Sequence, residues 1–123
     1  MTNKLDLAWD TFYFYTEEIS EFESQYFSNT KTIKNFLKSE NFPQKDQRKR
    51  LLNKSNKCMD SLIILYKKQM DAISDLIELN KSGIEIPPEQ EIDNTSLCSL
   101  KNITATLIEE MRTHKSEIKD LLG

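Results

Sequence analysis

An apolar residue recurs every three or four positions from residue 5 to residue 36, and this spacing constrains the fold more than any other feature of the chain. Nine of the ten positions reached in this way are apolar or aromatic, and none is charged. They are Leu5, Ala8, Phe12, Tyr15, Ile19, Phe22, Tyr26, Asn29, Ile33 and Phe36. A repeat of this kind places its members on one face of an α-helix and is typical of a coiled-coil seam. The spacing therefore predicts a long helix over about residues 4–40.

Two later segments carry the same three-four repeat. The second seam consists of Leu52, Asn56, Met59, Ile63, Tyr66, Met70, Ile73 and Ile77, with Leu62, Leu65, Gln69 and Leu76 beside it. The third consists of Leu97, Leu100, Thr104, Leu107, Met111, His114, Ile118 and Leu121. Helices are thus predicted over about residues 45–82 and 94–122. Because the second stripe is wider than a strict seam, we expect the second helix to contact two neighbours.

The few helix-breaking residues mark where these helices end. Pro43 disfavours helical backbone at the residue before it, and Gly83 suits the position just after a helix. The third helix starts either with Pro88 in its first turn or with Asn94 as its cap, and the sequence leaves both open. Three long helices joined by short connections predict an all-α fold: an elongated antiparallel three-helix bundle, coiled-coil-like, forming a single domain over residues 1–123.

Charge is unevenly distributed along the chain, although the net charge is only -3. Residues 1–30 hold six acidic residues against Lys4 alone, whereas residues 31–81 hold twelve basic residues against six acidic ones. The remaining residues hold eight acidic and four basic side chains. A basic segment between two acidic segments suits packing between neighbouring helices. It argues against nucleic-acid binding by the whole chain, which requires a basic domain.

Residues that carry catalysis or bind metals are scarce. His114 is the only histidine, and Cys58 and Cys98 show neither the C-x-x-C spacing nor the second ligand pair of a zinc site. Gly83 and Gly123 alone cannot form a glycine-rich loop that cradles phosphate. The sequence therefore predicts no catalytic residue, metal, cofactor or small-molecule substrate, and a protein that is not an enzyme.

The chain also lacks the apolar segments that target proteins to membranes. No basic and then apolar leader opens it, and the longest uninterrupted apolar run is Leu62–Tyr66. We therefore expect neither a signal peptide nor a membrane span, and we expect a cytoplasmic or nuclear location. The chain ends at Gly123 without a clear stop, so a fragment of a longer protein is an open alternative.

Eight of the eleven aromatic residues fall within residues 9–27: Trp9, Phe12, Tyr13, Phe14, Tyr15, Phe22, Tyr26 and Phe27. Successive residues of a helix point about 100° apart, so the four from Phe12 to Tyr15 cannot all face one core. Phe12 and Tyr15 belong to the seam, whereas Tyr13, Phe14, Trp9 and Phe27 leave it. Either the other helices cover these surplus rings, or the rings bind another chain. We favour the second interpretation, because aromatic residues are enriched at interface hot spots.

A basic run at the start of the second helix is the other candidate surface. It comprises Lys45, Arg48, Lys49, Arg50, Lys54 and Lys57, with only Asp46 opposing it. Such a run is compatible with nucleic acid or another anionic partner. No aromatic residues interleave with it as stacking platforms, so we favour a solvated face or pairing with the acidic first helix.

The predicted function is that of a non-enzymatic scaffold or adaptor subunit in a multiprotein assembly. It would join one or more protein partners, as a homo- or hetero-oligomer, through helix packing of the aromatic first helix. The alternative is a regulatory module that binds nucleic acid or another anionic partner through the basic start of the second helix.

Overall fold

Three long helices account for nearly all of the structure, a computed structural model that describes residues 4–38, 44–81 and 93–122. They are α1 (Lys4–Lys38), α2 (Lys45–Lys81) and α3 (Asn94–Leu122), and among the described residues only Gln44 and Asp93 lie outside them. The prediction of an all-α, three-helix fold is confirmed. The predicted helix ends at residues 40 and 82 and the turns at Pro43, Gly83 and Pro88 fall outside the described residues.

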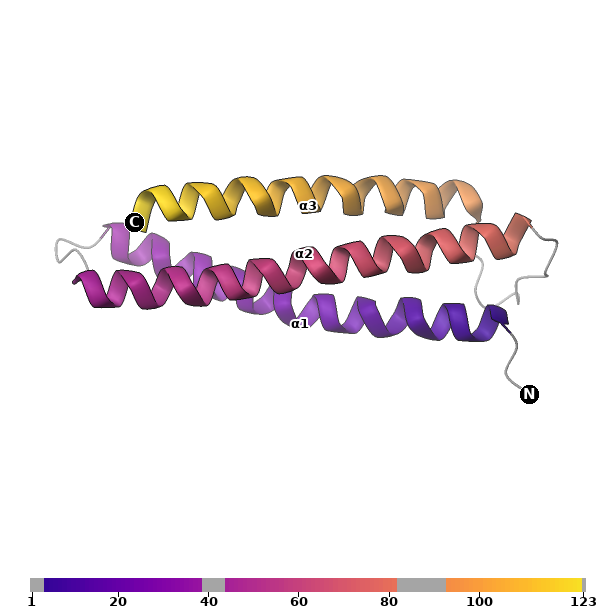
Figure 1. Cartoon of the computed structure of the whole chain (residues 1–123), viewed down its shortest axis with the longest axis horizontal. Helices are drawn as coiled ribbons and strands as arrows, with labels where there is room; N and C mark the ends of the chain where they lie inside the picture. The colour runs from indigo at the N-terminus through magenta and orange to yellow at the C-terminus, as the bar shows by residue number, and fades with distance from the viewer. Residues whose placement is uncertain (1–3, 39–43, 82–92, 123) are drawn as a thin grey trace.

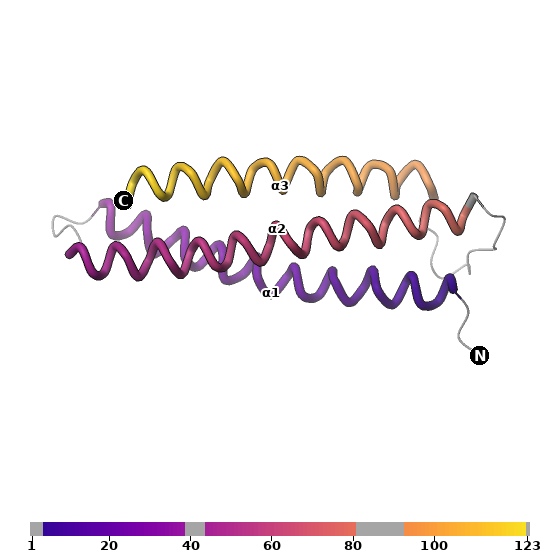
Figure 2. The backbone as a smooth tube through the Cα atoms, viewed as in Figure 1, coloured from indigo at the N-terminus to yellow at the C-terminus, as the bar shows by residue number. Residues whose placement is uncertain are grey.

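The helices lie lengthwise beside one another as an elongated bundle, with α2 between α1 and α3 (Figures 1 and 2). The chain runs up, down and up again, so α2 is antiparallel to both neighbours. At a rise of about 1.5 Å per residue, the longest helix spans roughly 55 Å. Residues of α2 pack against both α1 and α3, whereas the Cα atoms of α1 and α3 stay more than 8 Å apart throughout the described residues. The wide apolar stripe of α2 thus contacts two neighbours, as its width predicted.

The buried side chains form two clusters, one in each half of the bundle. The larger cluster surrounds Met59, Leu62 and Tyr66 of α2, which Tyr26 of α1 and Met111 of α3 cover from either side. The smaller cluster consists of Leu5, Trp9, Phe12, Ile73, Leu76, Ile77 and Leu97. Complete burial of one large apolar side chain stabilises a fold by about 1.5–3 kcal/mol, so these clusters hold the helices together.

The core-facing side of α1 differs from the predicted seam at one large residue. Trp9, expected outside the seam, is completely buried at 0% exposure, whereas the seam residue Ala8 is only half-buried. Residues three and four apart lie on one face of a helix, so Trp9 shares the core-facing side with Leu5 and Phe12. At the end of α3, Leu122 is buried while the seam residue Leu121 is exposed, because the contact face of a straight helix drifts by about 20° per heptad from a strict seven-residue repeat.

The start of α3 is capped by a residue that the sequence analysis did not select. The backbone N–H of Ser96 donates a hydrogen bond to Asp93 Oδ1 over 2.8 Å, and the N–H of Leu97 donates to the Asp93 carbonyl over 3.0 Å. Asp93 is therefore the N-cap. Of the two starts that the sequence left open, Asn94 as the cap is wrong, because Asn94 is the first helical residue and its side chain accepts a hydrogen bond from Asn80 of α2.

Candidate functional site

A groove runs between α1 and α3 over the middle of α2, and we call it the α1–α3 groove. Its volume is about 470 Å³, and Tyr66, Gln69 and Ile73 of α2 form its floor. The α1 wall includes Thr16, Ser20 and Ser24, and the α3 wall includes Thr104. These small side chains leave space between two helices that both pack against α2.

The rims of the α1–α3 groove are apolar and exposed. Phe27 of α1 is 64% exposed and Ile103 of α3 is 56% exposed, and both line the groove. Apolar side chains that border one hollow from two helices form a surface suited to packing against another protein.

The floor of the groove contains a polar residue that separates the two core clusters. Gln69 is buried, and its Nε2 atom donates a hydrogen bond to Thr16 Oγ1 over 2.9 Å. Its Oε1 atom has no hydrogen-bond partner among the described residues. Opposite it, the buried Thr104 hydroxyl donates to the Leu100 carbonyl within its own helix over 2.7 Å. A polar layer of this kind costs stability, because an unpaired buried oxygen loses its hydration.

Beyond the groove, towards the C-terminal end of α1, a tyrosine of α1 contacts a histidine of α3. Tyr26 of α1 stacks on His114 of α3 with ring centroids 6.0 Å apart, and its hydroxyl shares a hydrogen bond with His114 Nδ1. Burial raises the pKa of Tyr26, the side chain of Thr30 opposes this by hydrogen bonding, and the carboxylates of Glu110 and Glu117 add to the increase. Burial likewise raises the pKa of Tyr66, with the carboxylate of Glu23 adding to the effect. Acidic side chains of α1 and α3 therefore act on the hydroxyls of Tyr26 and Tyr66.

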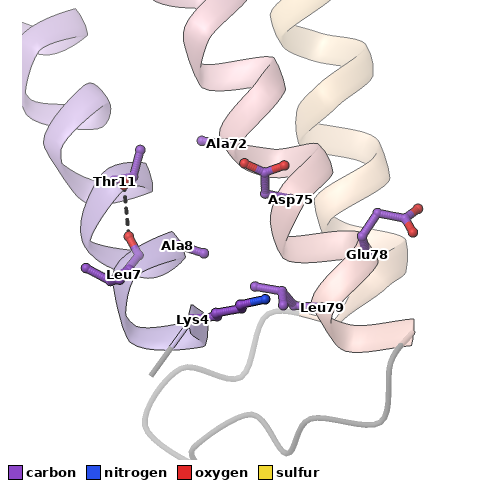
Figure 3. Close-up of a pocket in the computed structure, with 8 residues that line it drawn as sticks. All are labelled: Lys4, Leu7, Ala8, Thr11, Ala72, Asp75, Glu78 and Leu79. Atoms are coloured by element: carbon purple, nitrogen blue, oxygen red, sulfur yellow. Dashed lines mark hydrogen bonds between the residues drawn. The ribbon is translucent and has the colours of Figure 1, made fainter. Parts of the chain in front are cut away.

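A second hollow, of about 410 Å³, lies on the opposite side of α1, where the first turns of α1 meet the last turns of α2 (Figure 3). Leu7, Ala8 and Thr11 line it from α1, and Leu79 closes it from α2. Figure 3 shows the Thr11 hydroxyl turned back to its own helix, where it donates to the Leu7 carbonyl over 2.8 Å. Its polar groups come from Lys4, Asp75 and Glu78, so its charges are mixed and define no single class of ligand.

The structure divides the eight predicted aromatic interface residues into three groups. Trp9, Phe12 and Tyr26 are buried in the core of the chain itself. Tyr15 and Phe22 are half-buried. Tyr13, Phe14 and Phe27 are exposed, although Tyr13 stacks on Trp9 with ring centroids 5.8 Å apart. The interpretation that other helices cover the rings therefore describes the first group, and only the last group offers a free surface.

The predicted basic run occupies the first turns of α2, where all of its members except the half-buried Arg48 are exposed. Figure 1 places the C-terminal end of α1 at the same end of the bundle. This end of α1 carries Lys34 and Lys38, which are exposed as well. The sequence placed Lys34 and Lys38 in the basic segment of residues 31–81, and the antiparallel packing brings them to the same end of the bundle as the basic run.

The surroundings of Cys58 are those of a buried packing residue, and no group of side chains suited to a metal ion accompanies it in the described residues. Cys58 is buried, its Sγ donates to the Phe22 carbonyl over 3.3 Å, and burial raises its pKa. Across residues 4–38, 44–81 and 93–122, no three His, Cys, Asp or Glu side chains are grouped so that they could hold a metal ion. Over the same ranges, no helix combines the length and the apolar character needed to cross a membrane.

Comparison with known protein families, with curated protein sequences and with solved structures finds no match to this chain.

Proposed function

We propose that this chain is a non-enzymatic helical adaptor or scaffold subunit that binds a protein partner by helix packing. The observation that carries the proposal is the position of Phe27 and Ile103, which border the α1–α3 groove from opposite sides and stay more than half exposed. Covering one such side chain with a partner contributes up to about 1.5–3 kcal/mol.

The shape of the bundle supports the same role. Two helices that pack against a third and leave a groove between them can bind a fourth helix in that groove. Four-helix bundles close their cores in this way. The axes of packed helices lie about 8–10 Å apart. Each outer helix packs against α2, and the Cα atoms of the two outer helices are not in contact. A cytoplasmic or nuclear location, which we predict from the sequence, belongs to this proposal.

A matched pair of variants tests the proposal. Ile103→Asp places a charge on the groove rim, whereas Ile64→Asp places one at an equally exposed isoleucine of α2 that does not line the groove. The tagged chain is purified from the organism that makes it, and each co-purifying protein is quantified by mass spectrometry. We expect at least one partner to be retained by the wild type and by Ile64→Asp and lost with Ile103→Asp. Equal retention by both variants would remove the groove from the proposal.

The basic end of the bundle supports a second candidate function, the binding of nucleic acid or another anionic partner. Exposed Lys49, Arg50 and Lys54 of α2 lie at the same end as Lys34 and Lys38 of α1. A charge-driven complex weakens steeply as salt rises. Titration of a fluorescent oligonucleotide at two salt concentrations, with wild type and with Lys49→Glu plus Arg50→Glu, tests this function. Oligonucleotide binding that is unchanged by higher salt and by the double charge reversal would exclude this function.

A further inference from the structure

An exposed face of α1, which borders the α1–α3 groove at Ser24, carries a stripe of five residues with an ordered pattern of charge. The stripe contains Asp10, Glu17, Ser24, Lys31 and Lys38, each seven residues from the next, and all five are exposed. Seven residues are close to two helical turns, so the five side chains lie in one row along the helix. From one end to the other, the row reads acid, acid, serine, base, base.

This row is complementary to itself when a second copy of the helix runs in the opposite direction. With a two-fold axis beside Ser24, Asp10 faces Lys38 of the second copy and Glu17 faces Lys31 of the second copy. The symmetry repeats both pairs on the other side of the axis, because the contact is isologous. A parallel arrangement would place acid against acid and base against base, so the charges select the antiparallel direction.

A neighbouring row on the groove side of α1 also fits its counterpart in the second copy, because its large side chains face smaller or basic ones across the same axis. It contains Tyr13, Ser20, Phe27 and Lys34, again seven residues apart. In the antiparallel pair, Phe27 lies over the small Ser20 of the second copy, and Tyr13 lies beside Lys34 of the second copy, where a cation–π contact is available. Phe27 and Tyr13 are exposed in the single chain, the latter by 45%. Their rings provide the apolar area that a row of exposed ion pairs lacks.

We propose that the chain forms an antiparallel two-fold dimer through this outer face of α1, centred on Ser24. The inference rests on the proposed function, in which α1 is a helix-packing surface, and it names a second copy as the partner of that surface. Contact between one pair of helices is smaller than the roughly 800 Å² per partner of a standard interface. We therefore expect a dimer with a dissociation constant in the micromolar range that weakens as salt rises.

Charge reversal at one pair of positions tests the proposal. In Glu17→Lys, two lysines face each other across the axis, and in Lys31→Glu, two carboxylates do so. Each variant alone should dimerise at least tenfold more weakly than wild type in sedimentation equilibrium at low salt. An equimolar mixture of the two variants should restore dimers, because every pair then joins opposite charges. Lys68→Glu, an exposed reversal on α2, is the control and should dimerise as wild type does.

The outcomes separate this inference from the proposed function. A wild-type chain that remains monomeric at all concentrations, or a mixture that fails to restore dimers although both variants keep wild-type helicity by circular dichroism, would overturn the dimer. Phe27 and Ser24 also line the α1–α3 groove, so a partner in the groove and a second copy would compete for this part of α1. Ile103→Asp, on α3 outside the dimer face, changes the groove without changing the dimer contact. Loss of groove binding with the dimer intact would instead overturn the groove.

Cross-linking gives a measurement that does not depend on charge. Ser24→Cys in a Cys98→Ser background places two thiols at the two-fold axis, and mild oxidation should convert most of the chain to a disulfide-linked dimer. Thr106→Cys in the same background, an exposed position on α3, should remain monomeric under these conditions. Equal cross-linking at the two positions would contradict an axis at Ser24.

Discussion

Tyr26 and His114 join the two outer helices directly, because the Tyr26 hydroxyl and His114 Nδ1 share a hydrogen bond and the two rings stack with an interplanar angle of 8°. The Cα atoms of α1 and α3 stay more than 8 Å apart in the described residues. These long side chains therefore connect two helices whose Cα atoms are not in contact.

Replacement of Tyr26 by phenylalanine isolates the hydrogen bond in this link. Tyr26→Phe keeps the stacked ring and removes the hydroxyl, so we expect the free energy of unfolding to fall by about 0.5–1.5 kcal/mol. Tyr13→Phe, at an exposed tyrosine of the same helix, should change it by less than about 0.5 kcal/mol. Urea denaturation followed by circular dichroism measures both, and equal values for the two variants would show that the link contributes nothing.

A buried and an exposed aromatic residue of α1 should differ sharply in their effect on stability. Trp9 is completely buried in the smaller core cluster, whereas Phe14 is mostly exposed. Trp9→Ala leaves a large cavity and should lower the free energy of unfolding by about 3–5 kcal/mol. Phe14→Ala should lower it by less than about 0.5 kcal/mol. A large loss with Phe14→Ala, measured by thermal melting, would mean that its ring is covered in solution.

Removal of the polar group on the groove floor should stabilise the isolated chain. Gln69→Leu eliminates a buried Oε1 atom without a partner among the described residues, at the loss of one hydrogen bond to Thr16. Since an unsatisfied buried acceptor costs about 1–3 kcal/mol and a hydrogen bond returns about 1 kcal/mol, we expect a gain of roughly 1 kcal/mol. Gln69→Ala, which opens a cavity instead, should destabilise the chain. A loss of stability with both variants in urea denaturation would argue that Gln69 is satisfied.

The cap of α3 should make stability depend on pH in the acidic range. The backbone and side chain of Ser96 hold the pKa of Asp93 below its ordinary value. A carboxyl group with a lowered pKa stabilises the folded state above the ordinary value of about 3.9, and this contribution is lost as pH falls through the folded-state pKa. Asp93→Ala should therefore melt at a lower temperature than wild type at pH 7, and the difference should shrink below about pH 4.

Asp71→Ala removes an exposed carboxylate from the middle of α2 and is the control for the cap. A difference between wild type and Asp93→Ala that is equally large at pH 7 and at pH 3 would contradict a charged cap.

The sequence by itself determined the three helices, because a three-four apolar repeat has no other regular structure that buries it on one face. The repeat also located most of the core: Leu5, Phe12 and Ile33 are buried where the seam of the first helix places them. The double width of the second seam predicted that α2 contacts two neighbours. The order of charges along α1 also follows from the sequence, since it depends only on residue type and spacing.

The tertiary structure decided which of these residues remain free. Trp9 is buried because it lies on the same face of α1 as Leu5 and Phe12 and belongs with them to the smaller core cluster, which includes residues of α2 and α3. The α1–α3 groove depends on how far apart two helices are held by a third, a distance set by side-chain volumes on all three. Phe27 is exposed and Tyr26 is buried, although they are adjacent in sequence, because only one of the two points to α2 and α3. Local spacing therefore fixed the elements, while packing across the bundle fixed the surface.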